Sequence, residues 1–307
     1  MSSSPSPFLP GLAAKRILVT GARGRLAACL IPVLRTAGCD VRLFSRTGGE
    51  GCLPWDALWS GSHLAEADGI LHLAWSTFPA TAESAADDAP AVDLALLERL
   101  LTHWSRGANR PQLVFFSSAG TVYGPTGADA ANEETPCRPI SRYGRTKLMA
   151  EQMITRCAAG GLPATILRVS NPYGFNQLTQ RAQGIIPHAF HCAQTGRPLS
   201  LWGDGSAQKD FLHSADFLRA VGLVLAGQLT GTYNIAHGQS HRISEVIAEI
   251  EAITGRSIAV ETSPPRSWDV HDVLLDNTKF RQAAGWAPAT DLRAGLQLTH
   301  QELSRTS

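Results

Sequence analysis

Paired cysteines are absent from this 307-residue sequence, and their absence narrows the kinds of protein it can be. No two of its six cysteines form a CxxC pair, and their spacing matches no familiar metal site. We therefore expect free thiols in a reducing compartment, with neither a disulfide framework nor a bound metal. The cysteines are Cys29, Cys39, Cys52, Cys137, Cys157 and Cys192.

A strong charge and long apolar runs are absent as well. The formal net charge is +1, whereas a nucleic-acid binder usually carries a basic stripe. No apolar run approaches the ~20 residues that span a bilayer, and the Ser- and Pro-rich residues 1–11 lack the charged start and apolar core of a signal peptide. We expect a soluble, cytoplasmic protein with no nucleic-acid or membrane partner. Its hydrophobic content of 44% suits one large domain or two modest ones.

Short β-type apolar runs alternate with helix-type stretches over the first half of the chain. Such alternation is typical of βαβ units, so it predicts an α/β fold with a doubly wound parallel sheet. We expect strands at residues 16–20, 41–45, 69–74, 112–118 and 164–169, and helices at 25–36, 92–106 and 143–159.

The regular alternation ends after Asn171, where proline and glycine become more frequent. This change predicts a smaller, interrupted C-terminal domain that binds substrate. We expect a tail at residues 1–14, a first domain at 15–173 and 208–236, and the second domain at 174–207 and 237–307.

Residues 17–27 read ILVTGARGRLA, which is the pattern of a strand, a tight glycine turn and the start of a helix. Gly21 can adopt backbone angles that other residues cannot, and Gly24 lets the main chain approach a pyrophosphate. Ala27 permits close packing of the helix on the strand. The free N–H groups of the helix attract an anion. This segment therefore predicts a dinucleotide-binding Rossmann sheet.

The end of the second strand distinguishes NAD from NADP. An acidic residue there binds the ribose 2′-OH of NAD, whereas an arginine accommodates the 2′-phosphate of NADP. This chain has Ser45 and Arg46 and no acid, and Arg23 in the glycine turn could reach the same phosphate. The alternative for each arginine is a solvated surface position. We expect NADP in preference to NAD.

Tyr143 and Lys147 are four residues apart in an expected helix, so the phenol and the ammonium share one face. A cation at about 4–6 Å favours the phenolate and lowers the tyrosine pKa by roughly one to three units. We expect Tyr143 to take a proton from a substrate hydroxyl while hydride leaves the same carbon.

These motifs together resemble the extended short-chain dehydrogenases/reductases, and most closely their NAD-dependent epimerase/dehydratase branch around UDP-galactose 4-epimerase. The similar stretches follow the family order from residue 16 to about residue 296. They are VTGARGRLA, HLAW at 72–75, SSAGTVYG ending at Gly124, YGRTK, LRVSNPYG at 167–174, LWGDG at 201–205, KDFLH ending at His213, YNI at 233–235 and GWAP at 285–288.

The sequence departs from the family at one catalytic position. The family's Ser or Thr of the catalytic triad is replaced by Ala119, so the resemblance implies that Ser118 or Thr121 supplies this hydroxyl. The alternative for Ser118 is that it ends a strand and bonds its backbone. Related 4,6-dehydratases carry an Asp-Glu pair where this chain has Gly120 and Thr121. This difference argues against a dehydratase.

The resemblance also implies the binding residues. Ala74 would lie at the cofactor, and Lys147 would hold the nicotinamide ribose as well as act in catalysis. Lys209 stands where the family more often has arginine, so the charge is kept and bidentate geometry is lost. The implied nucleotide-sugar contacts are Asn171, Trp202 beside the base, Lys209, and Arg266 on the diphosphate.

Three functions remain open, and we rank a UDP-hexose 4-epimerase acting through a transient 4-keto intermediate first. The second is an NADPH-dependent nucleotide-sugar ketoreductase or dehydrogenase, which Ser45 and Arg46 favour. The third is a noncatalytic NADP-binding protein, which Ala119 suggests. In the family, helices equivalent to residues 94–101 and 148–154 pair across a two-fold axis, so we expect a homodimer.

Overall fold

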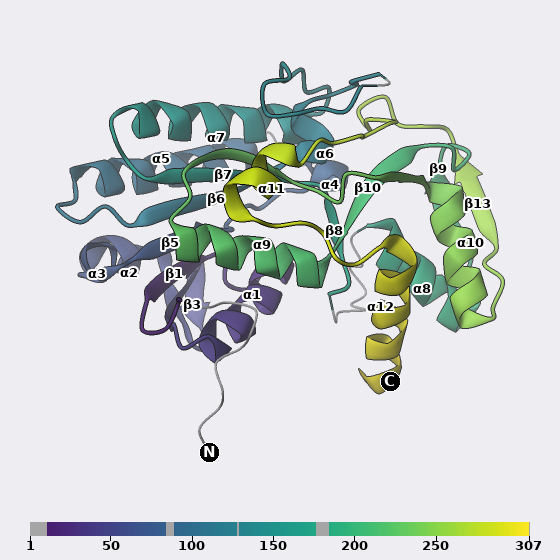
Figure 1. Ribbon diagram of the computed structural model, residues 1–307, viewed down its shortest axis with the longest axis horizontal. Coiled ribbons are helices and arrows are strands. Elements are labelled where there is room, and N and C mark those ends of the chain that lie inside the picture. The colour runs from purple at the N-terminus through teal and green to yellow at the C-terminus, as the bar shows by residue number, and fades with distance from the viewer. Residues whose placement is uncertain (1–10, 84–88, 128, 176–183, 307) are drawn as a thin grey trace. The chain divides into compact units, whose positions relative to one another are not determined.

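The computed structural model describes residues 11–83, 89–127, 129–175 and 184–306 (Figure 1). The chain divides into two compact units. The first comprises Met1–Ser118, Ser141–Arg168 and Leu218–Tyr233, and the second comprises Ala119–Ile140, Val169–Phe217 and Asn234–Ser307.

The first unit contains an eight-stranded sheet with the order β11-β7-β6-β5-β1-β2-β4-β3. The central strand β1 pairs in parallel with both β2 and β5, and β5 pairs in parallel with β6. The strand order therefore reverses between β1 and β5, and the expected doubly wound Rossmann sheet is confirmed. The strands are β1 (Arg16–Thr20), β2 (Asp40–Ser45), β3 (Thr47–Gly49), β4 (Cys52–Pro54), β5 (Gly69–His72), β6 (Gln112–Ser118), β7 (Ala164–Val169) and β11 (Gly231–Ile235).

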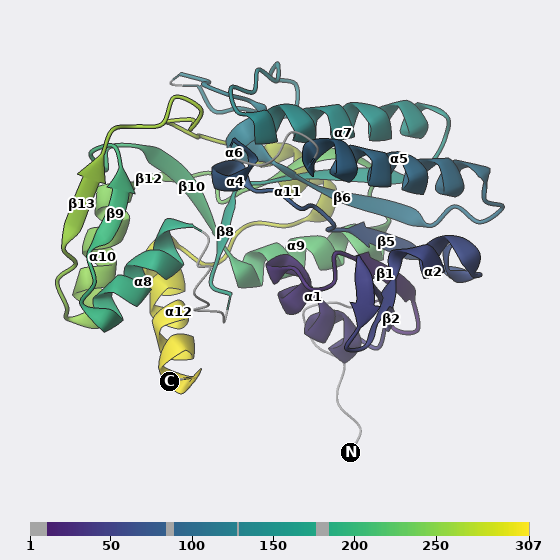
Figure 2. The ribbon, with the colours of Figure 1, turned by 180° about the vertical axis from the view of Figure 1, so that it is seen from behind.

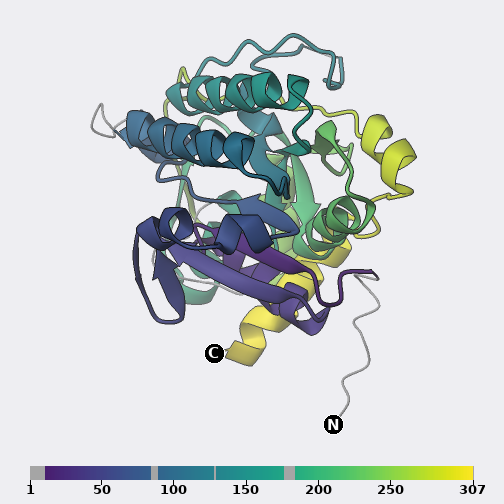
Figure 3. The same ribbon diagram turned by 90° about the vertical axis from the view of Figure 1, so that its left-hand side faces the viewer.

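Two long helices, α5 (Ala89–Arg106) and α7 (Arg142–Ala159), lie side by side over one face of this sheet (Figure 3). Leu97, Leu100, Leu101 and Trp104 recur at helical spacing along α5 and are buried in the core that α5 shares with α7. Helix α7 begins where the Ser141 hydroxyl accepts a 3.0 Å hydrogen bond from Gly144 N. The core therefore fixes the orientation of α7. The unit's other helices are α1 (Arg25–Thr36), α2 (Trp55–Ser60), α3 (His63–Glu66) and α4 (Pro79–Ala82), while α9 (Ser214–Gly227) begins in the second unit.

Two features of the first unit differ from the expectations. The segment after β2 forms an antiparallel hairpin of β3 and β4, whose tip includes left-handed Gly49, Glu50 and Gly51. The expected tail at 1–14 extends too far, because Leu12 is fully buried and its carbonyl accepts from the Cys39 thiol. Residues 1–10 lie outside the described part of the chain.

The second unit has two small sheets and its own apolar core. One sheet has the order β12-β10-β8, and in the other β13 pairs in parallel with β9. Helix α10 packs against both α8 and α12 (Figure 2). The elements are α6 (Ala119–Val122), β8 (Asn171–Tyr173), α8 (Ile185–Thr195), β9 (Leu199–Trp202), β10 (Gln208–His213), β12 (Ser240–Arg242), α10 (Ile243–Thr254), β13 (Val260–Ser263), α11 (Thr278–Ala284) and α12 (Leu292–Thr306).

The division into units differs from the expected boundaries. Residues 119–140, 169–173, 208–217 and 234–236 were expected in the first domain but lie in the second unit. Tyr123 illustrates the reason, because its hydroxyl donates a 2.7 Å hydrogen bond to Asn234 Oδ1 within that unit. Among the described helices, none combines the length and apolar character required to traverse a bilayer.

Candidate active site

The glycine turn joins β1 to α1 and lies against the segment that follows β5. Gly21 has a φ of +69°, and a Cβ added there would lie 2.6 Å from Ala74 N. Only glycine fits this approach of two backbones. Gly24 caps α1 without a side-chain hydrogen bond, and the first turn of α1 holds no acidic residue. Ala27 is fully buried, as the expected close packing of helix and strand requires. This turn has the geometry that receives a dinucleotide pyrophosphate.

The end of β2 lies beside the hairpin of β3 and β4. Ser45 is buried, and its hydroxyl has no hydrogen-bond partner among the described residues. Arg46 is exposed. Arg23 donates to the hairpin carbonyls of Gly48 at 2.6 Å and Gly49 at 3.1 Å. The hairpin therefore holds the Arg23 guanidinium beside the end of β2.

Tyr143 and Lys147 occupy one face of α7, as the four-residue spacing predicts. The Lys147 ammonium donates a 2.8 Å hydrogen bond to the carbonyl of Phe116 in β6. It lies 3.9 Å from the ring centre of Trp75, 4.7 Å from that of Phe115 and 5.8 Å from that of Tyr143. Lys147 is buried, so the cation is held among aromatic rings at the carboxyl ends of β5 and β6.

The electrostatics of this pair differ from the expectation. Burial lowers the pKa of Lys147 to about 7, although the carboxylates of Asp93 and Glu151 raise it. Burial, followed by the charge of Asp93, raises the pKa of Tyr143 above that of a free phenol. The expected lowering by Lys147 is wrong for the protein alone. Desolvation of the phenolate is the larger cause of the rise, and the negative charge of Asp93 adds to it.

A buried ion pair lies one turn beyond Lys147 on α7. Glu151 and Arg168 form a salt bridge of 2.7 Å, and Glu151 also accepts a 2.5 Å hydrogen bond from the Ser117 hydroxyl. All three side chains are buried. Ser117 therefore ties the end of β6 to α7 and serves the structure at this position.

The two candidate hydroxyls near Ala119 lie on different elements. Ser118 is the last residue of β6 in the first unit, and Thr121 lies in α6 of the second unit. Ala119 is buried and begins α6. Beside α6, the Asn171 amide lies 3.9 Å from the position that a Cβ on Gly120 would take. The second unit thus brings the Asn171 side chain to the turn that carries Thr121.

The other expected substrate residues gather around β9, β10 and the segment after β13. The Arg266 guanidinium stacks 3.8 Å above the ring centre of Trp202, which is 49% exposed. Trp268 lies 4.9 Å from the same guanidinium. Lys209 forms a 3.0 Å salt bridge with Asp269 and also donates to the Val270 carbonyl. Arg266 and the two tryptophans thus form a cationic and aromatic cluster in the second unit, and Lys209 is bound to the residues that directly follow Trp268.

The sequence reasoning missed several residues that contact this machinery. The motif at 72–75 includes Trp75 without giving it a role, and no motif contains Trp268. Glu151 and Asp93 also lie outside every motif, although each is a carboxylate on the otherwise apolar face of a helix. An acid at a helical position that the pattern assigns to the core is the signal that could have found both.

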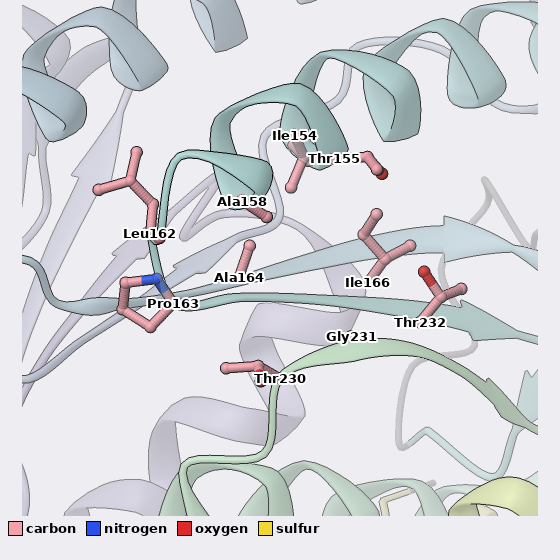
Figure 4. A pocket seen from close by; sticks show the side chains of 11 residues that line it. Ile154, Thr155, Ala158, Leu162, Pro163, Ala164, Ile166, Thr230, Gly231 and Thr232 are labelled. Carbon is pink, nitrogen blue, oxygen red and sulfur yellow. The ribbon is translucent and has the colours of Figure 1, made fainter.

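A pocket of about 500 Å³ lies elsewhere in the first unit (Figure 4). It is lined by Ile154 and Ala158 of α7, Leu162, Ile166 of β7, and Thr230 before β11. At a rise of about 1.5 Å per residue, this end of α7 is far from Tyr143 at the start of the helix. The pocket is therefore separate from the candidate active site.

Comparison with known proteins agrees with this geometry. A UDP-glucose 4-epimerase of Corynebacterium glutamicum is 30% identical over 310 aligned positions, covering 91% of this chain and 92% of that protein. The crystal structure of Thermus thermophilus UDP-glucose 4-epimerase complexed with NAD has a TM-score of 0.83 at 25% identity, covering 95% of this chain and all of that one. The Thermotoga maritima UDP-glucose 4-epimerase structure with UDP-glucose has a TM-score of 0.80 at 25% identity, with 95% and 99% coverage.

A family model also matches residues 17–236, the range that carries the glycine turn, Tyr143, Lys147 and Asn171. Its match includes most of the chain, and it agrees with the resemblance noted from the motifs. The chain belongs to the NAD dependent epimerase/dehydratase family.

Proposed function

We propose that this protein is an NAD(P)-dependent nucleotide-sugar 4-epimerase that acts on a UDP-hexose through a transient 4-keto intermediate. The observation that carries the proposal is the placement of Tyr143 and Lys147 on one face of α7, with Lys147 bonded to the Phe116 carbonyl of β6. The similarity to UDP-glucose 4-epimerases over nine-tenths of the chain supports this choice of reaction and substrate.

The residues of the first unit fit a nicotinamide dinucleotide. Gly21 and Gly24 would border its pyrophosphate, and Ala74 would lie beside it because it meets Gly21 across the turn. The Ser45 hydroxyl is buried and has no hydrogen-bond partner within the described part of the chain, so it is a polar group of the kind that a ribose hydroxyl satisfies. When bound, the nicotinamide supplies the acceptor and donor of hydride.

NADP(H) is the form that the end of β2 favours. Arg46 is an exposed cation directly after Ser45, and neither position carries the acid that binds a 2′-OH. The hairpin holds Arg23 beside the same strand end through the Gly48 and Gly49 carbonyls. Both arginines would then stabilise a 2′-phosphate.

Proton transfer falls to Tyr143. Its phenolate would accept the proton of the sugar 4-hydroxyl as the C4 hydride leaves, and the phenol so formed would return that proton when the hydride adds to the other face. The Lys147 ammonium, fixed by Phe116, would stabilise the phenolate and hold the nicotinamide ribose. Ser118 or Thr121 would donate the hydrogen bond that, in the family, comes from a Ser or Thr at the position of Ala119.

Substrate binding falls to the second unit. Trp202 and Arg266 offer an exposed aromatic face and a planar cation for a base and its diphosphate. Lys209 adds positive charge, although its salt bridge with Asp269 limits its reach. Asn171, fixed by its 2.9 Å hydrogen bond to the Asp210 carbonyl, would contact the sugar nucleotide.

We also propose a homodimer and a cytoplasmic location. Val92 on α5 and Met149 on α7 are 56% and 52% exposed, and the two helices pack together in the first unit. A symmetric pairing of these helices would cover both side chains. All six cysteines are free, which suits a reducing compartment. Light scattering at micromolar concentration tests the dimer, which a monomer mass would exclude.

One assay separates epimerase from ketoreductase. The protein is incubated with UDP-galactose or UDP-N-acetylgalactosamine, and product sugars and absorbance at 340 nm are followed together. Interconversion at C4 without net change at 340 nm is expected. Stoichiometric consumption of NADPH with a keto-sugar would instead identify the reductase that Ser45 and Arg46 also suit. Absence of both reactions with any UDP-hexose would contradict the proposal.

A further inference from the structure

A buried carboxylate, Asp93, lies in the first unit beside the proposed catalytic pair. It is 4% exposed and belongs to α5. Its two oxygens accept hydrogen bonds from Ser76 N at 2.9 and 3.0 Å, and one also accepts from Ser76 Oγ at 3.0 Å. The carboxylate is therefore fixed against the segment that follows β5.

Lys147 contacts the same segment after β5, at the residue that precedes Ser76. Its ammonium lies 3.9 Å from the ring centre of Trp75, the neighbour of Ser76. The only hydrogen bond that the structure gives it among the described residues goes to the neutral carbonyl of Phe116. A buried ammonium with a neutral acceptor requires a nearby negative charge to remain protonated.

Two carboxylates act on this ammonium, and they differ in their own partners. Glu151 is already neutralised by its 2.7 Å salt bridge with Arg168. Asp93 forms no salt bridge with any described residue, and its hydrogen bonds come from the uncharged groups of Ser76. Its negative charge is therefore the one that the site leaves uncompensated.

We propose that Asp93 is a positioning residue for the catalytic pair, whose carboxylate keeps the Lys147 ammonium protonated in its aromatic surroundings. The assignment to catalysis rests on the proposed function, whereas the charge coupling is a property of the protein alone. Asp93 itself touches no reacting atom in this assignment. It acts through Lys147 and Tyr143.

The direction of the titrations agrees with this role. Asp93 is the larger of the two charges that raise the pKa of Lys147 against the lowering by burial. The same charge adds to burial in raising the pKa of Tyr143. Asp93 thus retains a proton on each member of the pair.

Other groups around Lys147 leave this role to Asp93. From β5, burial and then the charge of Lys147 lower the pKa of His72 to about 3, so this imidazole is neutral near pH 7. From α7, Tyr143 is uncharged and Glu151 is paired. Burial raises the pKa of Asp93, and the hydrogen bonds from Ser76, followed by the charges of Lys147 and Arg46, oppose that rise and favour its charged form.

The test measures the titration of Lys147 directly. The chain has only four lysines, so the protein labelled with ¹³C at the lysine ε carbon should give a resolved spectrum, in which Lys147→Arg identifies the Lys147 signal. In the wild type this signal should titrate near pH 7. In Asp93→Asn the midpoint should fall by about one pH unit. Glu98→Gln removes an exposed carboxylate from the same helix and should leave the midpoint unchanged.

Two further variants keep the test decisive. Asp93→Glu restores the charge and should bring the midpoint back toward the wild-type value. Asp93→Ser is a smaller neutral residue and should give the same fall if Asp93→Asn does not fold. A midpoint that stays within about 0.3 units of wild type in a folded neutral variant overturns the proposal, since one close charge is worth a unit or more.

Activity provides the separate readout. The alkaline limb of kcat for interconversion should move to lower pH in Asp93→Asn by the amount that the lysine midpoint moves. A moved midpoint in a protein that interconverts no UDP-hexose would retain the charge coupling and reject the proposed function. A moved limb with an unmoved midpoint would reject the role of Asp93 through Lys147.

Discussion

The Ser117 hydroxyl donates a 2.5 Å hydrogen bond to Glu151, the carboxylate that also pairs with Arg168. This contact joins the strand that ends beside the active site to the helix that carries Tyr143 and Lys147. Removing the charge in Glu151→Gln would leave the Arg168 guanidinium without its carboxylate, so we expect a loss of about 3–5 kcal/mol in the free energy of unfolding. Urea denaturation measures it, with the exposed Glu98→Gln as control. A loss below about 0.5 kcal/mol in Glu151→Gln would show that the pair adds nothing.

Tyr143→Phe tests the acid-base assignment. The ring and its packing remain while the titrating hydroxyl is lost, so folding and cofactor binding should survive. Turnover should fall by about 10²- to 10⁴-fold, the usual contribution of a positioned acid or base. Steady-state interconversion and cofactor titration measure the two effects. Near-wild-type turnover in this variant would exclude Tyr143 as the base.

The hydroxyl that replaces the family residue at Ala119 can be identified by a pair of variants. Ser118→Ala and Thr121→Val each remove one hydroxyl with little change in volume. The residue that shares the catalytic hydrogen bond should lower kcat by at least about tenfold, and the other should not. Ala119→Ser is the matched gain: it should restore activity lost in the sensitive variant. If neither variant lowers kcat, the catalytic pair works without a third hydroxyl.

Stability should depend on pH through Lys147. Its pKa is about 7 in the folded protein, whereas that of a free lysine side chain is 10.5. Between these values the unfolded chain binds more protons, so the free energy of unfolding rises with pH over this window. Below pH 7 the full cost of burying the charge is present.

Lys147→Met removes that cost. The variant should be more stable than wild type at pH 6 by roughly 1.4 kcal/mol per unit of pKa shift, and the gain should shrink as pH rises toward 10. Urea unfolding of both proteins at pH 6, 8 and 9.5 measures the difference. A gain independent of pH would assign it to packing instead of charge.

Arg46→Ala tests the cofactor preference. If Arg46 stabilises a 2′-phosphate, the variant should lose about tenfold or more in NADP(H) affinity, with little change for NAD(H). Fluorescence titration of both cofactors measures it, and Arg42→Ala, which removes an exposed arginine within β2, is the control. A wild type that prefers NAD(H) strongly would end the case for NADP(H).

The sheet could be predicted closely from the sequence because its central strands are buried on both faces. β1, β6 and β7 have the expected bounds to the residue, since each is a short apolar run between polar or turn residues. The hairpin of β3 and β4 was missed because TGGEGC has no alternation of apolar and polar residues. Its pairing depends on left-handed glycines that no periodicity encodes.

The positions of the catalytic pair could be predicted from the spacing of a motif. Their pKa values could not, because these depend on burial in the folded protein. The four-residue interval placed Tyr143 and Lys147 on one face correctly. The pKa of each depends on desolvation and on Asp93, which lies 50 residues from Tyr143 in the sequence and reaches the site only through the packing of α5 on α7. Trp268 was missed for a different reason. It contacts Arg266 through a local turn after β13, which no motif predicts.

The two glycines of the turn are required for different reasons. A Cβ at Gly21 would meet the backbone of Leu73 and Ala74, whereas one at Gly24 would meet only the Gly21 carbonyl of its own turn, at 3.1 Å. Gly21 is therefore required by the assembly of the sheet whether or not a dinucleotide binds. The same turn therefore carries two separate constraints: glycine at position 21 serves the packing of the sheet, whereas the only close contact at position 24 lies within the turn that faces the proposed pyrophosphate.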